Sequence, residues 1–265
     1  MGILRNLVGL LAALVCAGSV LGQGSGTGWK SPEGMVDAFL QIATRSDYSQ
    51  RERTLKKWVE GIRYGVIHRG GEIALHDGLV DVHMRHVAQI TGLDIRRTSR
   101  LEQANFLVVM TNDDHIAADT LAFGGSDADD QRDLAFRGSM CSASLRSDTK
   151  GAIRRAIAMI PVDRAHSAGQ LVGCVAEELT HLMGLTNDTR TTLPSIFSHG
   201  TVHSVLGGLD TTMLKMLYDG RVKSGMKADA LRPLLHVIAA EYQRAGVLDN
   251  AERLAGANGL AGLSP

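Results

Sequence analysis

The sequence lacks an excess of charge of either sign, because its 28 lysine and arginine residues balance 28 aspartate and glutamate residues. No basic stripe and no block of like charges stands out along the chain. Proteins that bind nucleic acid or an anionic membrane surface usually carry such a basic region. The charge pattern therefore argues against nucleic acid and against a membrane surface as the main partner.

The sequence also lacks a clear membrane span, since the apolar run near its start, Leu7–Val15, is too short to cross a bilayer. Arg5 precedes this run and small residues follow it up to Gly22, which is typical of a secretory signal with its cleavage site. We expect residues 1–22 to be a signal peptide and residues 23–31 a flexible spacer. After removal of the signal, the sequence predicts a periplasmic or secreted protein without a membrane span.

Cysteine is scarce, and removal of the signal leaves only Cys141 and Cys174 of the three cysteines. In an oxidising compartment an even pair favours one disulfide. Two buried free thiols are the alternative. Because we expect export, the disulfide is favoured.

The apolar share of 44% is sufficient for a full-sized core. Periodicity predicts helices over 32–43, 74–91, 167–183, 210–218 and 228–244, and strands over 58–67, 105–110, 139–145 and 152–162. The segment 112–132 is predicted to be a loop, and its acidic cluster lacks the spacing of a calcium-binding EF hand. This order predicts one α+β domain over 32–248, with a mixed sheet, a long central helix packed on it and a helical C-terminal part. Residues 249–265 are predicted to form a frayed tail.

The most informative segment is 174–188, on the helix predicted to begin after Ser167. Glu177 and His181 are four residues apart, so they share one helix face and can present an oxygen and a nitrogen to one ion. Glu178 lies one step around the helix, where a general base reaches water on such an ion. Gly184 is predicted to adopt a left-handed conformation that ends the helix and returns the chain to the same site.

Solvated charge is the alternative interpretation of these glutamates. The helix is apolar around much of its circumference, which places the glutamates at a buried boundary where ionised carboxylates need a partner. An ion pair with Arg154 or Arg155 would also satisfy them. Cys174 is a further candidate ligand if it forms no disulfide, and the histidines that could complete a metal site are His166, His199 and His203. The Glu178-x-x-His181 spacing also occurs in di-iron bundles, but those need a second such motif, and the sequence has none.

Residues 177–188 resemble the active-site helix of the metzincins, H-E-x-x-H-x-x-G-x-x-H/D. By this resemblance Glu178 is the general base and His181 a metal ligand. Glu177 stands in place of the first histidine. The third ligand position is occupied by Asn187, with Asp188 one residue later.

The resemblance continues downstream. The turn Pro194-Ser195-Ile196-Phe197 is similar to the methionine-containing turn beneath the metal, with Phe197 or Ile196 in place of methionine. The motifs over 174–226 look like a bacterial exported family of unknown function, the one numbered 2927. The resemblance implies a metzincin-like fold and no particular reaction, since the family has none assigned.

Two functions are compatible with these residues. The first is a non-catalytic metzincin-like domain that serves in envelope binding or assembly and takes an extended peptide or an envelope protein as partner. The alternative is a divalent-metal-dependent peptidase or hydrolase with Glu178 as general base. The sequence alone demands no cofactor, and the candidates are zinc or another divalent metal, because a carboxylate-rich ligand set suits manganese or calcium as well.

Overall fold

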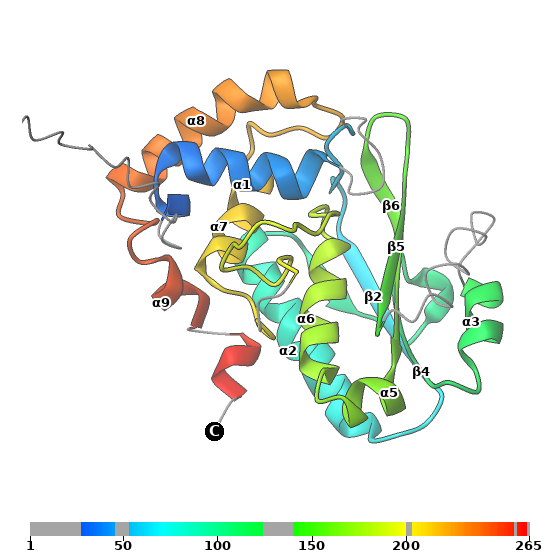
Figure 1. The fold of residues 1–265 in the computed structure, drawn as a ribbon. Helices are drawn as coiled ribbons and strands as arrows, with labels where there is room; N and C mark the ends of the chain where they lie inside the picture. The colour runs from blue at the N-terminus through cyan, green and yellow to red at the C-terminus, as the bar shows by residue number, and fades with distance from the viewer. Residues whose placement is uncertain (1–27, 46–52, 124–139, 200–202, 257–258, 264–265) are drawn as a thin grey trace, which may run out of the picture.

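The computed structural model describes residues 28–45, 53–123, 140–199, 203–256 and 259–263. These residues form an α+β fold with a six-stranded sheet and eight α-helices (Figure 1). The helices are α1 (Pro32–Thr44), α2 (Ile73–Thr91), α3 (Ile116–Phe123), α5 (Val162–Ser167), α6 (Leu171–His181), α7 (Gly208–Leu217), α8 (Ala228–Arg244) and α9 (Ala251–Gly256). The strands are β1 (Lys57–Trp58), β2 (Ile62–His68), β3 (Ile95–Arg97), β4 (Phe106–Thr111), β5 (Ser142–Ser147) and β6 (Ala152–Pro161). Three short 3-10 helices are η1 (Gly28–Lys30), η2 (Leu101–Gln103) and η3 (Leu260–Leu263).

The sheet is mostly parallel. Its five parallel strands follow the order β1-β6-β4-β2-β3, and β5 pairs antiparallel with β6. In the centre, Val108 of β4 lies opposite Val66 of β2 and Ala158 of β6. All six residues of β4 are buried, as parallel strands covered on both faces require. The predicted buried strand at 105–110 is therefore confirmed, displaced by one residue.

The two faces of the sheet carry separate apolar clusters, because successive side chains of a strand point to opposite faces. Phe106, Val108 and Met110 join the main core, which also contains the apolar faces of α1, α2, α6 and α7. The opposite face carries a smaller cluster of Leu107, Val109, Ile157 and Met159, against which Phe123 of α3 packs. The main core positions α6 on the sheet (Figure 1).

The predicted fold class is confirmed, and several elements match closely. Helix α8 has the predicted bounds, and α2 begins one residue earlier than predicted and ends at Gly92 in a left-handed conformation with φ 71°. Strand β6 ends at Pro161 as expected. The predicted strand at 58–67 is divided, because β1 pairs with β6 whereas β2 pairs with β3 and β4.

The central helix is shorter than predicted. Ser167 ends α5 and does not cap the next helix, since its hydroxyl donates to the carbonyl oxygen of Asp163 at 2.8 Å. Gly169 then adopts a left-handed φ of 67°, and α6 begins at Leu171. The chain uses this glycine to change direction between the end of β6 and the helix that carries the candidate site.

Two segments predicted to be irregular are helical. Residues 116–123 of the predicted loop form α3, whose buried Asp119 pairs with Arg69 at 2.6 Å after β2. The acidic cluster of that loop, at 127–130, lies outside the described residues. Residues 251–256 of the predicted tail form α9, which contacts α7, and Glu252 accepts a hydrogen bond from the N–H of Gly208 at 2.8 Å. Tertiary contacts decide both segments, so the local composition was misleading.

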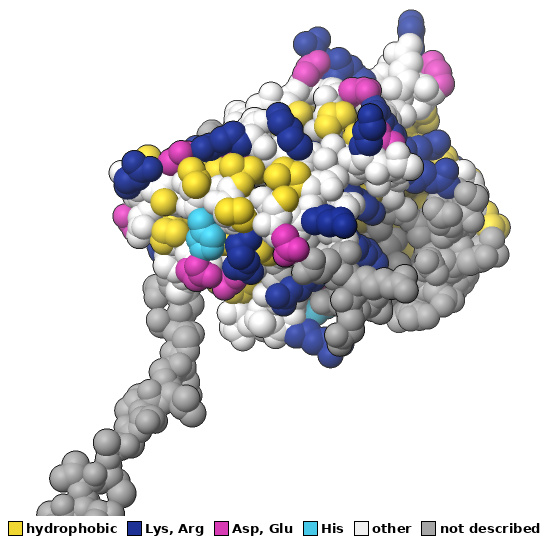
Figure 2. Space-filling view, turned by 90° about the horizontal axis from the view of Figure 1, so that it is seen from above, with side chains coloured by type: hydrophobic (Ala, Val, Ile, Leu, Met, Phe, Trp, Pro, Cys, Tyr) yellow, Lys and Arg dark blue, Asp and Glu magenta, His cyan; other side chains and the backbone are white. Residues whose placement is uncertain are grey.

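The predicted signal peptide lies outside the described residues. Among the helices of the described part of the chain, none is long and apolar enough to cross a membrane. Seen from above, the face covered by α1 and α8 has apolar side chains lying among charged ones of both signs (Figure 2). Val237 of α8 is an exposed apolar residue, with 52% of its surface accessible.

Candidate metal centre

Helix α6 presents its acidic residues and its histidine at the edge of the main core. The apolar residues Val175 and Leu179 are fully buried against the core, whereas Glu177, Glu178 and His181 are half-buried. The four-residue spacing of Glu177 and His181 places both on one face of the helix. The predicted boundary position of these side chains is confirmed.

The chain reverses directly after α6. Gly184 has φ +115°, and a Cβ atom there would collide with the backbone carbonyl oxygen of Lys56. Only glycine therefore fits at this close approach. The reversal brings Asp188 back to the helix, and one ligand atom each from Glu177, His181 and Asp188 lies within 4.8 Å of the others. The sequence expectation that the glycine returns the chain to the helix is confirmed.

His181 is oriented as metal-binding histidines are. Its Nδ1 lies 2.6 Å from the carbonyl oxygen of Leu185, so that this nitrogen carries the proton and donates. Nε2 is left facing Oδ1 of Asp188 at 3.1 Å. Metal-bound histidines usually donate their second ring nitrogen to a carbonyl or carboxylate in this way.

The residues present fit a bound cation. Oδ1 of Asp188 is buried, and no donor among the described residues is aligned to hydrogen-bond with it, although Nε2 of His181 is close. Oδ1 of Asp188 and an unprotonated Nε2 of His181 each direct a lone pair at the other. These lone pairs repel each other unless a proton or a cation lies between them. Burial alone would lower the pKa of His181, but Asp188 and the two glutamates raise it to about 9. The site therefore favours positive charge at this point.

The two glutamates have free carboxylates. Neither Glu177 nor Glu178 makes a hydrogen bond or ion pair with any residue in the described ranges. Burial raises the pKa of Glu178 to about 8, against the opposing effect of His181, and it also raises the pKa of Glu177. The alternative pairing with Arg154 or Arg155 is wrong, because neither glutamate has an ion-pair partner in the described ranges. The Arg154 guanidinium binds Asp148 at 2.9 Å and also Glu60.

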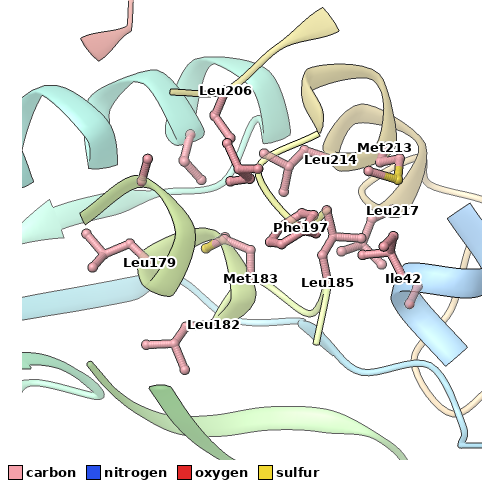
Figure 3. Packing of buried hydrophobic residues seen from close by; sticks show 14 of the residues in the cluster. Ile42, Leu179, Leu182, Met183, Leu185, Phe197, Leu206, Met213, Leu214 and Leu217 are labelled. Carbon is pink, nitrogen blue, oxygen red and sulfur yellow. The ribbon is translucent and has the colours of Figure 1, made fainter. Parts of the chain in front are cut away.

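The turn at 194–197 contacts the candidate site through the Phe197 ring. The Phe197 ring lies 4.5 Å from the His181 ring, with the planes tilted by 39°. Phe197 itself packs among Met183, Leu185 and Leu214 in the main core (Figure 3). Half-buried Pro194 begins this turn. Of the two residues that the sequence offered for this turn position, Phe197 is the one whose ring contacts His181.

Asn187 and His199 lie near the site but do not belong to the group of three converging ligand atoms. The side-chain amide of Asn187 donates to the carbonyl oxygen of Ile42 at 3.0 Å, and its backbone N–H donates to the same oxygen. Asn187 therefore anchors the loop to the end of α1, and it is Asp188 that joins the group. His199 lies at the rim, with Nε2 3.9 Å from Oδ2 of Asp188 and its side chain 61% exposed. The sequence had offered His199 only as one of three loop histidines.

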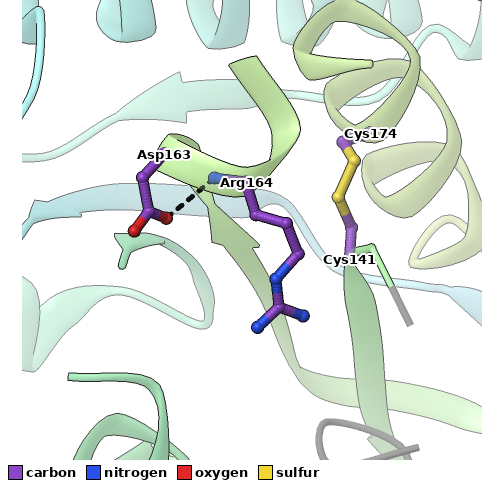
Figure 4. The surroundings of a disulfide bond; sticks show 4 residues. All are labelled: Cys141, Asp163, Arg164 and Cys174. Carbon is purple, nitrogen blue, oxygen red and sulfur yellow. Dashed lines mark hydrogen bonds between the residues drawn. A yellow bond between two sulfur atoms is a disulfide. The ribbon is translucent and has the colours of Figure 1, made fainter. Parts of the chain in front are cut away.

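A disulfide joins the two remaining cysteines, as the sequence favoured. Cys141, just before β5, is bonded to Cys174 of α6, three residues ahead of Glu177 (Figure 4). Their Cα atoms are 5.8 Å apart. The bond ties β5 to the helix that carries the site and removes Cys174 from the candidate ligands.

Comparison with known proteins gives one match. A family described as "Protein of unknown function (DUF2927)" matches residues 32–237. No curated protein and no solved structure matches the chain.

Proposed function

Since this chain belongs to the DUF2927 family of proteins of unknown function, we propose its role from the site itself: it binds a divalent metal ion and uses it in hydrolysis. Glu177, His181 and Asp188 would hold the ion, and Glu178 would act as the general base. The convergence of these three ligand atoms within 4.8 Å carries the proposal. A group with two carboxylates and one imidazole suits zinc and manganese, and calcium less well because of the imidazole.

A divalent ion bound here would supply a Lewis acid that polarises a carbonyl group and acidifies water. The half-buried carboxylate of Glu178 would accept a proton and pass it to a leaving group. A pKa near neutrality suits both steps, and burial raises the pKa of Glu178 to about 8. Phe197 closes the side of the His181 ring and holds its orientation.

The resemblance to the metzincins concerns the scaffold of this site and implies no particular reaction. Supporting features are the helix spacing, the glycine reversal at Gly184 and the mixed sheet on which α6 packs. Two ligand positions differ from the metzincin pattern, with Glu177 for the first histidine and Asp188 for the third ligand. Kinship with the metzincins stays a prediction, as does the activity.

Metal analysis of protein purified without chelator tests the proposal. We expect about one divalent ion per chain and a rise in melting temperature on adding Zn²⁺ or Mn²⁺ to chelated protein. His181→Ala and Asp188→Ala should abolish both effects. His236→Ala, which removes a half-buried histidine of α8 that faces Glu33, should change neither. Glu178→Gln should keep the metal and lose peptide hydrolysis. A metal-free wild type without any thermal response would refute the proposal.

A binding role without catalysis is the second candidate, and one observation favours it. Strand β5 pairs only with β6, and no residue in the described ranges pairs with its outer edge. The disulfide holds this strand next to α6. An extended peptide or a segment of an envelope protein would add to the sheet there. The disulfide also fits the proposed export to the periplasm or the medium.

The two candidates are separable by experiment. A library of fluorescent extended peptides should bind the wild type, and Ser144→Glu on β5 should weaken that binding while leaving the metal content unchanged. Peptide binding without hydrolysis in metal-loaded protein would favour the binding role. Absence of binding by every peptide would exclude strand addition at β5.

A further inference from the structure

A cavity of about 510 Å³ opens at the carboxyl ends of β2, β4 and β6. None of the proposed metal ligands lines it. Gly70–Glu72 follow β2, Asn112 follows β4, and α5 follows β6. The volume is within the range of small-molecule sites. Three chain segments that are distant in the sequence thus build one wall.

The position of this cavity is the one at which open sheets bind ligands. The connection after β2 runs through α2 to β3 on one side of the sheet, and the connection after β4 leads through α3 towards β5 and β6 on the other. The strand order therefore reverses between β2 and β4. In open sheets of parallel strands, ligands bind outside the carboxyl ends at such a reversal.

Helix α2 begins at this cavity without a side-chain cap. Its N-cap residue Glu72 makes no capping hydrogen bond. Among the described residues, no acceptor is hydrogen-bonded to the N–H of Ala74 or Leu75 in the first turn. Gly70 and Gly71, both with positive φ (136° and 78°), precede the helix and line the cavity. A free first turn of a 19-residue helix favours negative charge.

An independent observation points to a ligand. His76 lines the cavity, is only 2% exposed, and has no hydrogen bond from either ring nitrogen to a described residue. Its Nδ1 is fully enclosed. Burial lowers the pKa of His76, so that at neutral pH the ring is uncharged and offers one N–H donor. A buried polar group without a partner is costly, and a ligand in the cavity would satisfy Nε2, the ring nitrogen that is not fully enclosed.

We propose that this cavity binds the anionic group of a small molecule, a phosphate or a carboxylate, between the N-terminus of α2 and the ring of His76. The carboxylate of Asp163 also lines the cavity, and two backbone hydrogen bonds offset part of its negative charge. One oxygen accepts the backbone N–H of Arg164 at 2.9 Å (Figure 4). The other accepts the backbone N–H of Asp113 at 3.1 Å. The exposed Glu72 at the cavity wall carries the negative charge that competes with the ligand for the same helix end.

The test is a titration of metal-free protein with inorganic phosphate and, separately, with acetate. Chemical shifts of the Ala74 and Leu75 amides would be followed by NMR, with sodium chloride at equal ionic strength as the reference. Saturation by phosphate identifies a phosphate-bearing ligand, and saturation by acetate alone identifies a carboxylate. Shifts that sodium chloride reproduces, or no saturation by either anion, would overturn the proposal.

Two variants should change the affinity in opposite directions. His76→Gln should weaken binding about tenfold, because a flexible amide replaces the fixed N–H donor of the ring. Glu72→Gln should strengthen it about two- to fivefold by removing a like charge at the helix end. Gly78 lies on the same helix, and a Cβ atom there would meet nothing within 4 Å. Gly78→Ala should therefore leave the affinity unchanged.

The exposed Glu72 substitution keeps the proposal testable if His76→Gln does not fold. An unchanged affinity in Glu72→Gln would contradict an anion at this helix end, as would wild-type affinity in a folded His76→Gln protein. His181→Ala is measured in parallel. Its affinity for the anion should equal that of the wild type, which shows that the anion does not bind at the metal centre.

Discussion

Replacing Asp210 with alanine is expected to destabilise the protein more than any exposed acidic substitution. Asp210 is fully buried at the third position of α7. Oδ1 accepts the hydroxyl of Ser195 at 2.5 Å, and Oδ2 accepts the N–H groups of Gly207 at 2.9 Å and Ile196 at 3.3 Å. Alanine removes the acceptor that these three donors share, among them the buried N–H of Ile196.

The magnitude follows from those contacts. A hydrogen bond to a charged group contributes about 1.5–3 kcal/mol, and removal of one partner from a buried charged network costs about 3–5 kcal/mol. Because the three bonds share one carboxylate, their contributions do not add in full. We expect Asp210→Ala to lower the free energy of unfolding by about 3–5 kcal/mol, a large part of the roughly 5–15 kcal/mol of a typical domain.

The same change should reach the metal centre. Asp210 holds the turn that carries Phe197, and the Phe197 ring lies 4.5 Å from His181. Loss of the carboxylate frees this turn, so that metal affinity should fall even at temperatures where the protein remains folded. This second readout distinguishes a local effect on the site from a general loss of stability.

Urea unfolding followed by circular dichroism at pH 7.5 measures the effect. Asp229→Ala is the matched control, since Asp229 lies in the first turn of α8 and is exposed. Its loss should cost no more than about 1 kcal/mol from the helix dipole. A cost below 1 kcal/mol for Asp210→Ala, or one equal to that of the control, would refute the reasoning.

Three further predictions rest on single features. Burial raises the pKa of Asp210 from its ordinary 3.8 to about 6, so the folded protein binds this proton more tightly than the unfolded chain does. The resulting stabilisation of the fold is fully present below about pH 4 and is lost as the pH rises through 6. The wild type should therefore lose about 3 kcal/mol relative to Asp210→Asn over that range, and a difference between the two proteins that is constant with pH would contradict this. Replacing Cys141 and Cys174 by serine opens a loop with a sequence separation of 33 and should cost roughly 3–4 kcal/mol in thermal or urea unfolding; equal stability with and without reductant would argue against the bond. Gly184→Ala should lower soluble yield and abolish metal binding, because its Cβ meets the Lys56 carbonyl and its φ is +115°; normal metal content in that variant would exclude the tight reversal.

Elements decided by local patterns were predictable. Helix α2 has apolar residues at helical spacing and a glycine after its last turn, and α8 has a clear amphipathic pattern. Both signals lie within the segment itself. Helices α3 and α9 have no such signal, because α3 is held by the pair of Asp119 with Arg69 and α9 by contacts with α7. Partners far away in the sequence decide such segments.

The candidate metal site divides in the same way. The sequence by itself determined that Glu177 and His181 share a helix face and that Gly184 turns the chain back, because helix geometry and backbone sterics act over a few residues. Only the tertiary structure decided that Asp188 faces His181 while Asn187 turns away, since the carbonyl of Ile42 at the end of α1 binds the asparagine amide. The cavity with His76 was equally invisible, because three strand ends meet there only after the sheet has formed.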